Sequence, residues 1–389
     1  MTTTINNEHN KLNVPNLRFK EFHGEWEKCR LGDVCTFLSG GTPKIDVKEY
    51  WNGTIPFVSA ISMHDTYILD SKLHISEEGL KHGSRLLTKN NLLLLVRGSM
   101  LWNTIPICLN KNDVAFNQDV KGIIANDTIN NEFLLYWLKS KEQRLKYMVT
   151  GTGLGAGKLD TSDLLSMIVY IPAMKEQDKV ARLLSLFDER IATQSKIIED
   201  LKKLKSAISK KLLCNDKWTT YKIQDIAEIG RGRVISSVEI DRQKHPLYPV
   251  YSSQTSNNGI MGYLDNYMFD GEYITWTTDG ANAGTVFYRI GKFNCTNVCG
   301  TLKILPKFDC YFVSLVLQQA TQKYVSSNLA NPKLMNNTMA SIKIRMPNIE
   351  TQKQLSKVFQ TLDSCLLVHQ RTCKMYLSEK QYLLRQMFI

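Results

Sequence analysis

The glycine-rich stretch "GTGLGAGKL", Gly151 to Leu159, is the part of this sequence closest to a catalytic motif. A phosphate-binding loop needs glycine six positions before its lysine and Ser or Thr directly after it. Thr152 and Leu159 stand at those two positions here. The segment before the loop also reads as a helix, so its amides are not set to meet phosphate at a helix N-terminus. The pattern therefore argues against nucleotide binding.

Other reactive motifs fail in the same way. "NPKL" at Asn331 lacks the aromatic of an amino-methyltransferase motif, and no cofactor glycine loop accompanies it. No HExxH, GxSxG or paired-carboxylate-plus-lysine arrangement stands out, and the seven histidines lack metal-like spacing. The nine cysteines form no CxxC pair, and Cys295 and Cys299 have no nearby histidine to complete a zinc site. We expect free thiols in a reducing compartment, with no catalytic and no metal site.

The charge balance favours a polyanionic partner. The 389 residues carry a net charge of +12, with 43% hydrophobic and 22% charged residues, as in a globular protein. Nucleic acid is the simplest such partner, because phosphate neutralisation releases counterions. A membrane surface is the alternative, but the charge is spread along the chain and no apolar run is long enough to span a bilayer. We expect a cytoplasmic protein. For Lys158 two interpretations stay open: it contacts a DNA phosphate, or it lies in a loop that ends the preceding helix and binds nothing.

A repeat organises the chain. "IPAMKEQDKVARLLSLFDERI" begins at Ile171, and the weaker copy "MPNIETQKQLSKVFQTLDSCL" begins at Met346. In both, a β-like run closes on proline and a charged amphipathic helix follows. The two prolines, Pro172 and Pro347, are 175 residues apart. Such a repeat predicts two equivalent halves.

Both helices carry a heptad seam with apolar residues in alternating steps of four and three. The offset of 175 residues matches the polar seam positions too, Gln194 with His369 and Lys205 with Lys380. We predict that the helices pair with each other. The alternative is two unrelated amphipathic helices that pack on separate cores. The predicted seam residues are Val180, Leu184, Phe187, Ile191, Gln194, Ile198, Leu201, Ile208, Leu212, Leu355, Phe359, Leu362, Leu366, His369, Tyr376, Leu383 and Met387.

The repeat extends into the segments before each helix. "WEKCRLGDVCTFLSGG" from Trp26 is similar to "WTTYKIQDIAEIGRGR" from Trp218, and short β-prone runs broken by Gly, Asn and Pro fill both segments. Helices are predicted over 131–148 and 311–325. The fold class is therefore α/β, with two mixed domains and two long helices. The predicted boundaries are a polar tail over 1–15, domains over 16–172 and 216–347, and long helices over 173–215 and 348–389.

This order of landmarks resembles the specificity (S) subunits of type I restriction-modification enzymes. The resemblance rests on the "W..CRLGDVCTFLSGGTP" opening, the "IP....EQ..VARLLSLFDERI" boundary and the lysine-rich "LKKLKSAISKKLL" helix end. "VYSSQTSNNGIMGYLDNYMFDGEYITWTTDGANAGTVFY", Val250 to Tyr288, looks like a target-recognition domain of that family. One departure is "GRGRV" in the second half, where the first half has "SGGTP".

The resemblance implies a non-catalytic chain with two target-recognition domains, each reading half of a bipartite double-stranded DNA site. It also implies a pseudo-two-fold arrangement, in which the helices form an antiparallel coiled coil that docks two methyltransferase (M) subunits. Two restriction (R) subunits would complete the enzyme. S-adenosylmethionine, ATP and Mg²⁺ would bind those partners and not this chain.

Two rival hypotheses remain open at this stage. One is a self-sufficient DNA-modifying enzyme with degenerate motifs, and the other is a coiled-coil scaffold that does not bind DNA.

If the chain does read DNA, its contacts should be loop residues whose groups match base edges or phosphates. The predicted contacts are Lys44, Ser59, Arg97, Ser99, Asn103, Lys158, Arg231, Arg233, Ser253, Gln254, Thr278, Asp279, Asn282 and Lys333. Each has a bland alternative as a solvated surface side chain. Arg97 and Thr278 are expected at corresponding places, as are Lys158 and Lys333.

Overall fold

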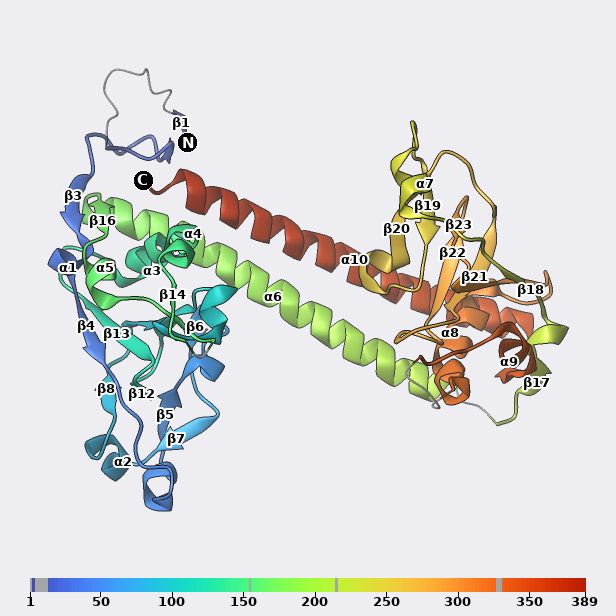
Figure 1. Cartoon of the computed structure of the whole chain (residues 1–389), viewed down its shortest axis with the longest axis horizontal. Coiled ribbons are helices and arrows are strands. Elements are labelled where there is room, and N and C mark those ends of the chain that lie inside the picture. Colours follow the sequence, from blue (N-terminus) through green and yellow to red (C-terminus); the bar gives the residue numbers. More distant parts are fainter. Residues whose placement is uncertain (1, 4–12, 154, 214–215, 327–330) are drawn as a thin grey trace. The chain divides into compact units, whose positions relative to one another are not determined.

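The chain forms two compact units in a computed structural model, which describes residues 2–3, 13–153, 155–213, 216–326 and 331–389 (Figure 1). Unit 1 comprises residues 1–196 and 370–389, and unit 2 comprises residues 197–369. Each unit thus holds one globular domain with a part of each long helix. Most of the predicted polar tail, residues 1–15, lies outside the described residues.

The domain of unit 1 is built on a five-stranded sheet in the order β4-β13-β9-β11-β6. Its central strand β9 (Leu92–Leu95) is buried at every position, because both edges are paired and both faces are covered. The other strands are β4 (Cys35–Ser39), β6 (Tyr67–Ile68), β11 (Ile107–Asn110) and β13 (Val120–Ala125).

Smaller sheets complete unit 1. One has the order β7-β5-β12-β8, one has the order β10-β15-β14, and the strands β3 and β16 pair with each other, as do β1 and β2. Their bounds are β1 (Thr2–Thr3), β2 (Leu17–Arg18), β3 (Glu27–Arg30), β5 (Ile55–Val58), β7 (Leu73–Ile75), β8 (Arg85–Leu87), β10 (Arg97–Gly98), β12 (Val114–Phe116), β14 (Thr150–Gly151), β15 (Gly157–Lys158) and β16 (Ile168–Ile171). The short helices are α1 (Leu31–Val34), α2 (Glu77–Lys81), α5 (Thr161–Leu165), η1 (Lys48–Trp51), η2 (Ala60–Ser62) and η3 (Ser99–Trp102).

The domain of unit 2 repeats this plan with fewer strands. Its main sheet has the order β18-β24-β21-β22, a second has the order β20-β19-β23, and β17 pairs with β25. The strands are β17 (Thr219–Lys222), β18 (Ala227–Arg231), β19 (Tyr248–Tyr251), β20 (Ile260–Leu264), β21 (Glu272–Thr277), β22 (Val286–Ile290), β23 (Asn294–Cys295), β24 (Cys299–Ile304) and β25 (Lys343–Met346). The short helices are α7 (Ser237–Asp241), α9 (Asn336–Ser341), η4 (Ile223–Asp225), η5 (Ser256–Gly259) and η6 (Thr321–Tyr324).

The helices inside both domains are shorter than predicted. The expected helix over 131–148 is two helices, α3 (Asn131–Ser140) and α4 (Glu142–Tyr147), because Lys141 leaves the helical region with φ −94° and ψ 11°. The expected helix over 311–325 is α8 (Cys310–Ala320), continued by the 3₁₀ turn η6. The predicted mixed α/β domains are confirmed, and the outer limits of both helical segments agree with the prediction to within one residue, although each segment is divided in two.

The two long helices are α6 (Met174–Leu212) and α10 (Ile349–Gln386). Within unit 1 they run antiparallel, because Asp188 contacts Lys380 while Ser195, further along α6, lies 3.8 Å from Cys373. Phe187 and Tyr376 pack edge to face there, with ring centroids 6.2 Å apart. The predicted pairing of the long helices is thereby confirmed. Every predicted seam residue is buried or partly buried.

Each domain is fixed to its long helix by the same clamp. In unit 1 the Gln177 side chain donates to the Pro172 carbonyl at 2.9 Å and accepts from the Asn130 backbone amide at 2.8 Å. In unit 2 Gln352 binds the Pro347 carbonyl at 2.8 Å and the Asp309 amide at 3.0 Å. Asn130 and Asp309 are the N-cap residues of α3 and α8, so the clamp ties the start of each domain helix to the start of a long helix.

Candidate nucleic-acid interface

Arg97 and Lys158 meet on a small sheet at the end of the core strand β9. They are register partners in β10 and β15, and the Leu159 amide donates to the Val96 carbonyl at 2.9 Å next to them. The chain leaves the core here, since Val96 is buried and Arg97 is exposed. The Lys158 ammonium also lies 3.0 Å from the Asp160 carboxylate, an exposed pair that solvent and a phosphate can both compete for.

Two further predicted contacts belong to this edge. Ser99 begins η3 directly after β10, and Asn103 caps its end with its amide 2.9 Å from the Met100 carbonyl. Both side chains are exposed. The structure thus groups Arg97, Ser99, Asn103 and Lys158 on one edge, which we call the first edge.

Lys44 and Ser59 lie on other segments of the same domain. The carbonyl of Lys44 accepts from the Trp51 indole at 3.0 Å, which closes the loop around it, and the lysine side chain is exposed. Ser59 is partly buried at the end of β5, where it caps η2. Among the described residues, no hydrogen bond or ion pair joins either residue to the first edge.

In unit 2 the corresponding edge is organised around a carboxylate. The Arg231 guanidinium donates to Asp279 Oδ2 at 3.2 Å, and the Lys333 ammonium lies 3.7 Å from Asp279 Oδ1. The buried Thr278 hydroxyl donates to the same carboxylate at 2.7 Å. Asp279 and Lys333 are also bridged as antiparallel strands. This second edge therefore contains two cations that share one internal anion.

The two edges correspond residue by residue, with one correction to the predicted alignment. The Leu334 amide donates to the Thr278 carbonyl at 2.8 Å, as the Leu159 amide donates to the Val96 carbonyl. Lys333 therefore corresponds to Lys158, as predicted. Arg97 corresponds to Asp279 and not to Thr278, so the prediction was off by one residue, because loop lengths differ upstream.

A loop after β19 carries two more predicted contacts of unit 2. The Ser253 carbonyl accepts from the Asn282 side chain at 3.2 Å, and the Gln254 side chain donates to the Ile260 carbonyl. Asn257 and Asn258 turn the loop with positive φ angles of 48° and 54°. These bonds occupy polar groups of Gln254 and Asn282 that a base edge would need.

Arg233, a predicted DNA contact, binds an acidic side chain of its own domain. Its guanidinium donates to Glu239 Oε2 at 2.9 Å, and this hydrogen-bonded pairing raises the pKa of Arg233 above its usual value. Its position one residue beyond Gly232 still leaves it exposed, so it stays a predicted contact.

Sequence reasoning missed the buried cation beneath the loop after β19. Arg289 is 3% exposed, and its guanidinium lies 3.5 Å from the ring centre of Tyr251 and 4.4 Å from that of Phe287. Burial lowers the pKa of Arg289, and no ion pair to it is found among the described residues. The stacked rings offset part of the desolvation cost, because an aromatic face attracts a cation. No periodic signal in the sequence marks such a site.

Sequence reasoning also missed a network at each domain–helix junction. In unit 1 the Tyr136 hydroxyl donates to Asp188 at 2.8 Å, and Asp188 pairs with Lys380 from the other long helix. In unit 2 Tyr311 donates to Asp363 at 2.6 Å, and Asp363 pairs with Lys205. The two lysines are the polar seam residues matched in the sequence, so that match marked the junctions without revealing their partners.

The charged pair at the junction of unit 1 is the more buried of the two. Burial, followed by the charge of Asp188, raises the pKa of Tyr136 far above its usual value. Burial lowers the pKa of the neighbouring Lys139 to about 8, and repulsion by Lys380 adds to this effect. The Lys139 ammonium donates to the Thr66 hydroxyl at 2.7 Å.

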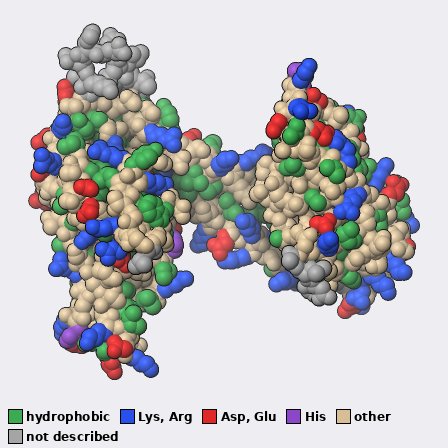
Figure 2. All heavy atoms as spheres, in the orientation of Figure 1, with side chains coloured by type: hydrophobic (Ala, Val, Ile, Leu, Met, Phe, Trp, Pro, Cys, Tyr) green, Lys and Arg blue, Asp and Glu red, His purple; other side chains and the backbone are tan. Residues whose placement is uncertain are grey.

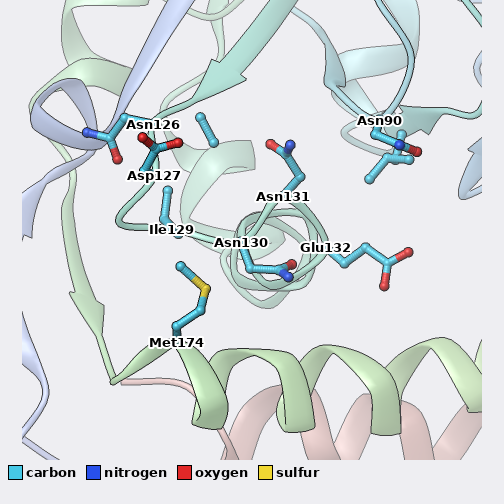
Figure 3. Close-up of a pocket in the computed structure, with 10 residues that line it drawn as sticks. Asn90, Asn126, Asp127, Ile129, Asn130, Asn131, Glu132 and Met174 are labelled. Atoms are coloured by element: carbon cyan, nitrogen blue, oxygen red, sulfur yellow. The ribbon is translucent and has the colours of Figure 1, made fainter.

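Two cavities of unit 1 are lined by none of the predicted contacts. One cavity of about 550 Å³ is lined by amide and carboxylate side chains, including Asn126, Asp127, Asn131 and Glu132, beside Met174 (Figure 3). An adjacent cavity of about 580 Å³ is lined by Glu25, Glu27 and Asp33, among others. Neither lining includes a lysine or an arginine, so both are unsuited to a polyanion.

Figure 2 shows lysine and arginine side chains over the visible faces of both units, interspersed with acidic ones. Within the part of the chain that the structure describes, no group of three or more His, Cys, Asp or Glu side chains is placed to hold a metal ion. No helix of the described ranges is long and apolar enough to cross a membrane.

Comparison with known proteins gives one family. Residues 23–203 and 215–374 each match the family described as "Type I restriction modification DNA specificity domain". The two matches coincide with the two halves of the repeat.

Relatives of similar sequence carry corresponding names. A chain of Mycoplasma pneumoniae named as a type I specificity subunit is 38% identical over 193 residues, covering 49% of this chain and 80% of the relative. The MpnII specificity subunit of the same organism is 42% identical over 145 residues, covering 37% and 43%. The EcoR124I/EcoR124II specificity subunit of Escherichia coli is 31% identical over 174 residues, covering 44% and 43%.

Solved structures support the fold. The S subunit of a type I restriction-modification system from M. genitalium superposes with a TM-score of 0.72 at 19% identity, covering 97% of this chain and 99% of that one. A chain from a study of type I system assembly and conformational transition gives a TM-score of 0.52 at 13% identity, covering 92% and 96%.

Proposed function

We propose, from the premise that this chain belongs to the family of type I restriction-modification DNA specificity subunits, that its two recognition domains read the two parts of a bipartite DNA target. Specificity subunits are the non-catalytic DNA-recognition components of these systems. The chemistry would accordingly reside in partner subunits, which would bind S-adenosylmethionine, ATP and Mg²⁺.

The observation that carries the proposal is the correspondence of the two edges. Each begins where an inner strand of the main sheet of its domain ends, and each places a lysine, the partly exposed Lys158 or the exposed Lys333, at the same backbone position. The other residues differ, with Arg97 in one edge where the other has Asp279. A shared phosphate contact beside different base-reading groups is what two readers of different sequences require.

Docking of two methyltransferase subunits, and of two restriction subunits through them, is the second part of the proposal. Nine cationic residues of α6 are exposed, which a coiled coil paired along one seam does not require, and five of them are spaced along most of the helix. These five are Arg182, Arg190, Lys196, Lys203 and Lys210. Native mass spectrometry with saturating methyltransferase should give two copies per chain. A stable complex that retains one copy would contradict this stoichiometry.

Exchanging one domain tests independent reading. Residues 218–346 begin and end beside the paired strands β17 and β25, so both cut points lie at one place in the fold. Replacing them with the corresponding segment of a relative should change one part of the methylated site and leave the other unchanged. The measurement is methylation mapping of the assembled methyltransferase complex. A change in both parts would contradict independent reading.

Two simpler assays separate the proposal from its rivals. A DNA-binding isotherm of the purified chain should weaken steeply with salt, which a scaffold that does not bind DNA would not show. The pure chain supplied with S-adenosylmethionine and Mg²⁺ should not methylate or cleave DNA. Activity in that assay would favour a self-sufficient enzyme.

A further inference from the structure

Trp102 is the most exposed of the tryptophans whose surroundings the structure describes. Its side chain lies at the end of η3 and is 50% exposed, whereas Trp26, Trp137 and Trp276 are at most 2% exposed. Trp51 and Trp218 are partly buried. Burying a ring of this size against another surface is favourable, so it can contribute strongly to binding where polar and cationic groups of the same edge surround it.

The ring is held in place. The indole Nε1 donates to the Gly155 carbonyl at 3.0 Å, which ties η3 to the loop between β14 and β15. A Cβ atom added at Gly151 would lie 3.9 Å from the ring, so a side chain there would just meet the indole. With the indole nitrogen satisfied, the exposed part of the ring is apolar and fixed in orientation. A partner therefore meets a rigid surface, at a small cost in side-chain entropy.

The surroundings of Trp102 favour a nucleic acid. Arg97 and Lys158 are register partners in the strands that η3 and the loop extend. The exposed hydroxyl of Ser99 and the exposed amide of Asn103 stand in the same short segment as the ring. Gly153 and Gly155 adopt positive φ angles of 78° and 76°, and among the described residues other than their chain neighbours no atom lies within 4 Å of where a Cβ would stand. A bare glycine backbone of this kind admits a close phosphate.

We propose that Trp102 is a DNA-contacting residue of the first recognition domain, with its indole ring packed against base edges and sugars in a groove of the duplex, Arg97 beside it on a base edge and Lys158 on the flanking phosphate. This inference rests on the proposed DNA-reading function. An aromatic ring that buries apolar surface against sugars and base edges adds affinity without a donor–acceptor match to one base pair. Trp102 would thus add affinity and fix the depth of approach, and Arg97 would add discrimination. In the second domain the connection between the corresponding strands, Asp279 to Val286, contains no aromatic residue, so the contact belongs to one part of the target.

Fluorescence of the full-length chain tests the contact directly. Acrylamide should quench the exposed Trp102 before the buried tryptophans, and a duplex carrying the mapped target should protect it. In Trp102→Phe the quenchable fraction should be largely lost, both with and without DNA. Quenching of the wild-type chain that saturating DNA leaves unchanged would overturn the proposal.

Binding measurements give the second test. Trp102→Ala should weaken target binding by about 10- to 100-fold, the loss typical of truncating an aromatic anchor at an interface, and Trp102→Phe should restore most of it. Leu69→Ala, which truncates an exposed apolar side chain outside the first edge, is the matched control and should bind like the wild type. Thermal unfolding of each variant shows that the fold is kept.

The outcomes separate this inference from the proposed function. Wild-type binding that is absent or insensitive to salt would reject DNA reading as a whole. Salt-sensitive wild-type binding that Trp102→Ala leaves unchanged would reject only the Trp102 contact. Loss of methyltransferase binding with intact DNA binding in Trp102→Ala would assign the ring to a protein partner and overturn the proposal.

Discussion

The two halves of the repeat are alike at their domain–helix junctions and differ at the two edges that we propose to contact DNA. At the junctions both halves use a tyrosine, an aspartate and a lysine from the other long helix, with Asp188 and Lys380 in one and Asp363 and Lys205 in the other. At the edges the halves keep one lysine and exchange an arginine for an aspartate. The two halves keep the same residue types where the charged groups are buried, and they differ where the side chains face solvent.

The physical reason lies in the cost of removing a partner. A sheltered charge without its counter-ion is strongly destabilising, so no member of a junction changes alone. An exposed side chain exchanges its partner for water at little cost. The junctions therefore hold the fold constant while the edges vary.

The largest expected effect comes from breaking the more buried junction. The side chains of Asp188 and Lys380 are 13% and 10% exposed, against 40% and 26% for Asp363 and Lys205. Asp188→Ala leaves a buried lysine unpaired and should lower the free energy of unfolding by about 3–5 kcal/mol. Asp363→Ala should cost about 1 kcal/mol, as for exposed pairs. Urea unfolding of both variants measures the difference, and equal losses would show that burial does not set it.

A smaller effect should appear as a pH dependence of unit 1. The pKa of Lys139 is about 8 in the folded chain against about 10.5 when unfolded, so the unfolded state binds more protons between these values. Stability should therefore rise with pH across that window, by up to about 3 kcal/mol from this group. Buried thiols and tyrosines have raised pKa values and therefore oppose this rise. The quantity to follow is the free energy of unfolding of the wild type minus that of Lys139→Met at each pH.

The corresponding residue of α8 supplies the control for this pH effect. Lys139 is the ninth residue of α3, and Gln318 is the ninth of α8. Gln318→Met should leave the pH profile of stability unchanged. A Lys139→Met profile parallel to that of the wild type between pH 8 and 10 would contradict the assignment.

At the edges, corresponding substitutions should act with opposite sign. Arg97→Ala should reduce discrimination at one base pair of the target by about 1–3 kcal/mol. Asp279→Asn removes the anion shared by Arg231 and Lys333, so it should strengthen binding to random DNA and steepen its salt dependence. Competition binding with target and random duplexes measures both. A loss of affinity for all sequences in both variants would show that the edges contact only the backbone.

The smallest effect should be the most uniform one. Lys158→Ala and Lys333→Ala should each weaken binding to every sequence and reduce the salt slope by about one unit. Since Lys158 also faces Asp160 and Lys333 faces Asp279, the two losses should be similar. Salt titration of both variants provides the test, and a change in sequence preference with either would move that lysine from phosphate to base contact.

The sequence predicted the features that depend on periodicity. The seam, the two halves and the mixed domains follow from heptads and repeated landmarks, which are local. It did not place the junction networks or the Arg289 stack, because these join residues such as Tyr251 and Arg289 that are distant in sequence. The alignment of Arg97 with Thr278 failed for a related reason, since only hydrogen bonds between strands fix a register across loops of unequal length.

The strand pairs β3–β16 and β17–β25, which close the two domains, have a further consequence. In unit 1 Glu27 stands opposite Ile171, and in unit 2 Thr219 stands opposite Met346. Entry and exit of the chain are therefore held together by a backbone ladder that does not depend on what lies between them. Lengthening such a closed segment costs only about 0.6 kcal/mol per doubling of a flexible loop. Recombination between genes can thus exchange a longer or shorter recognition domain at these two points without altering the long helices.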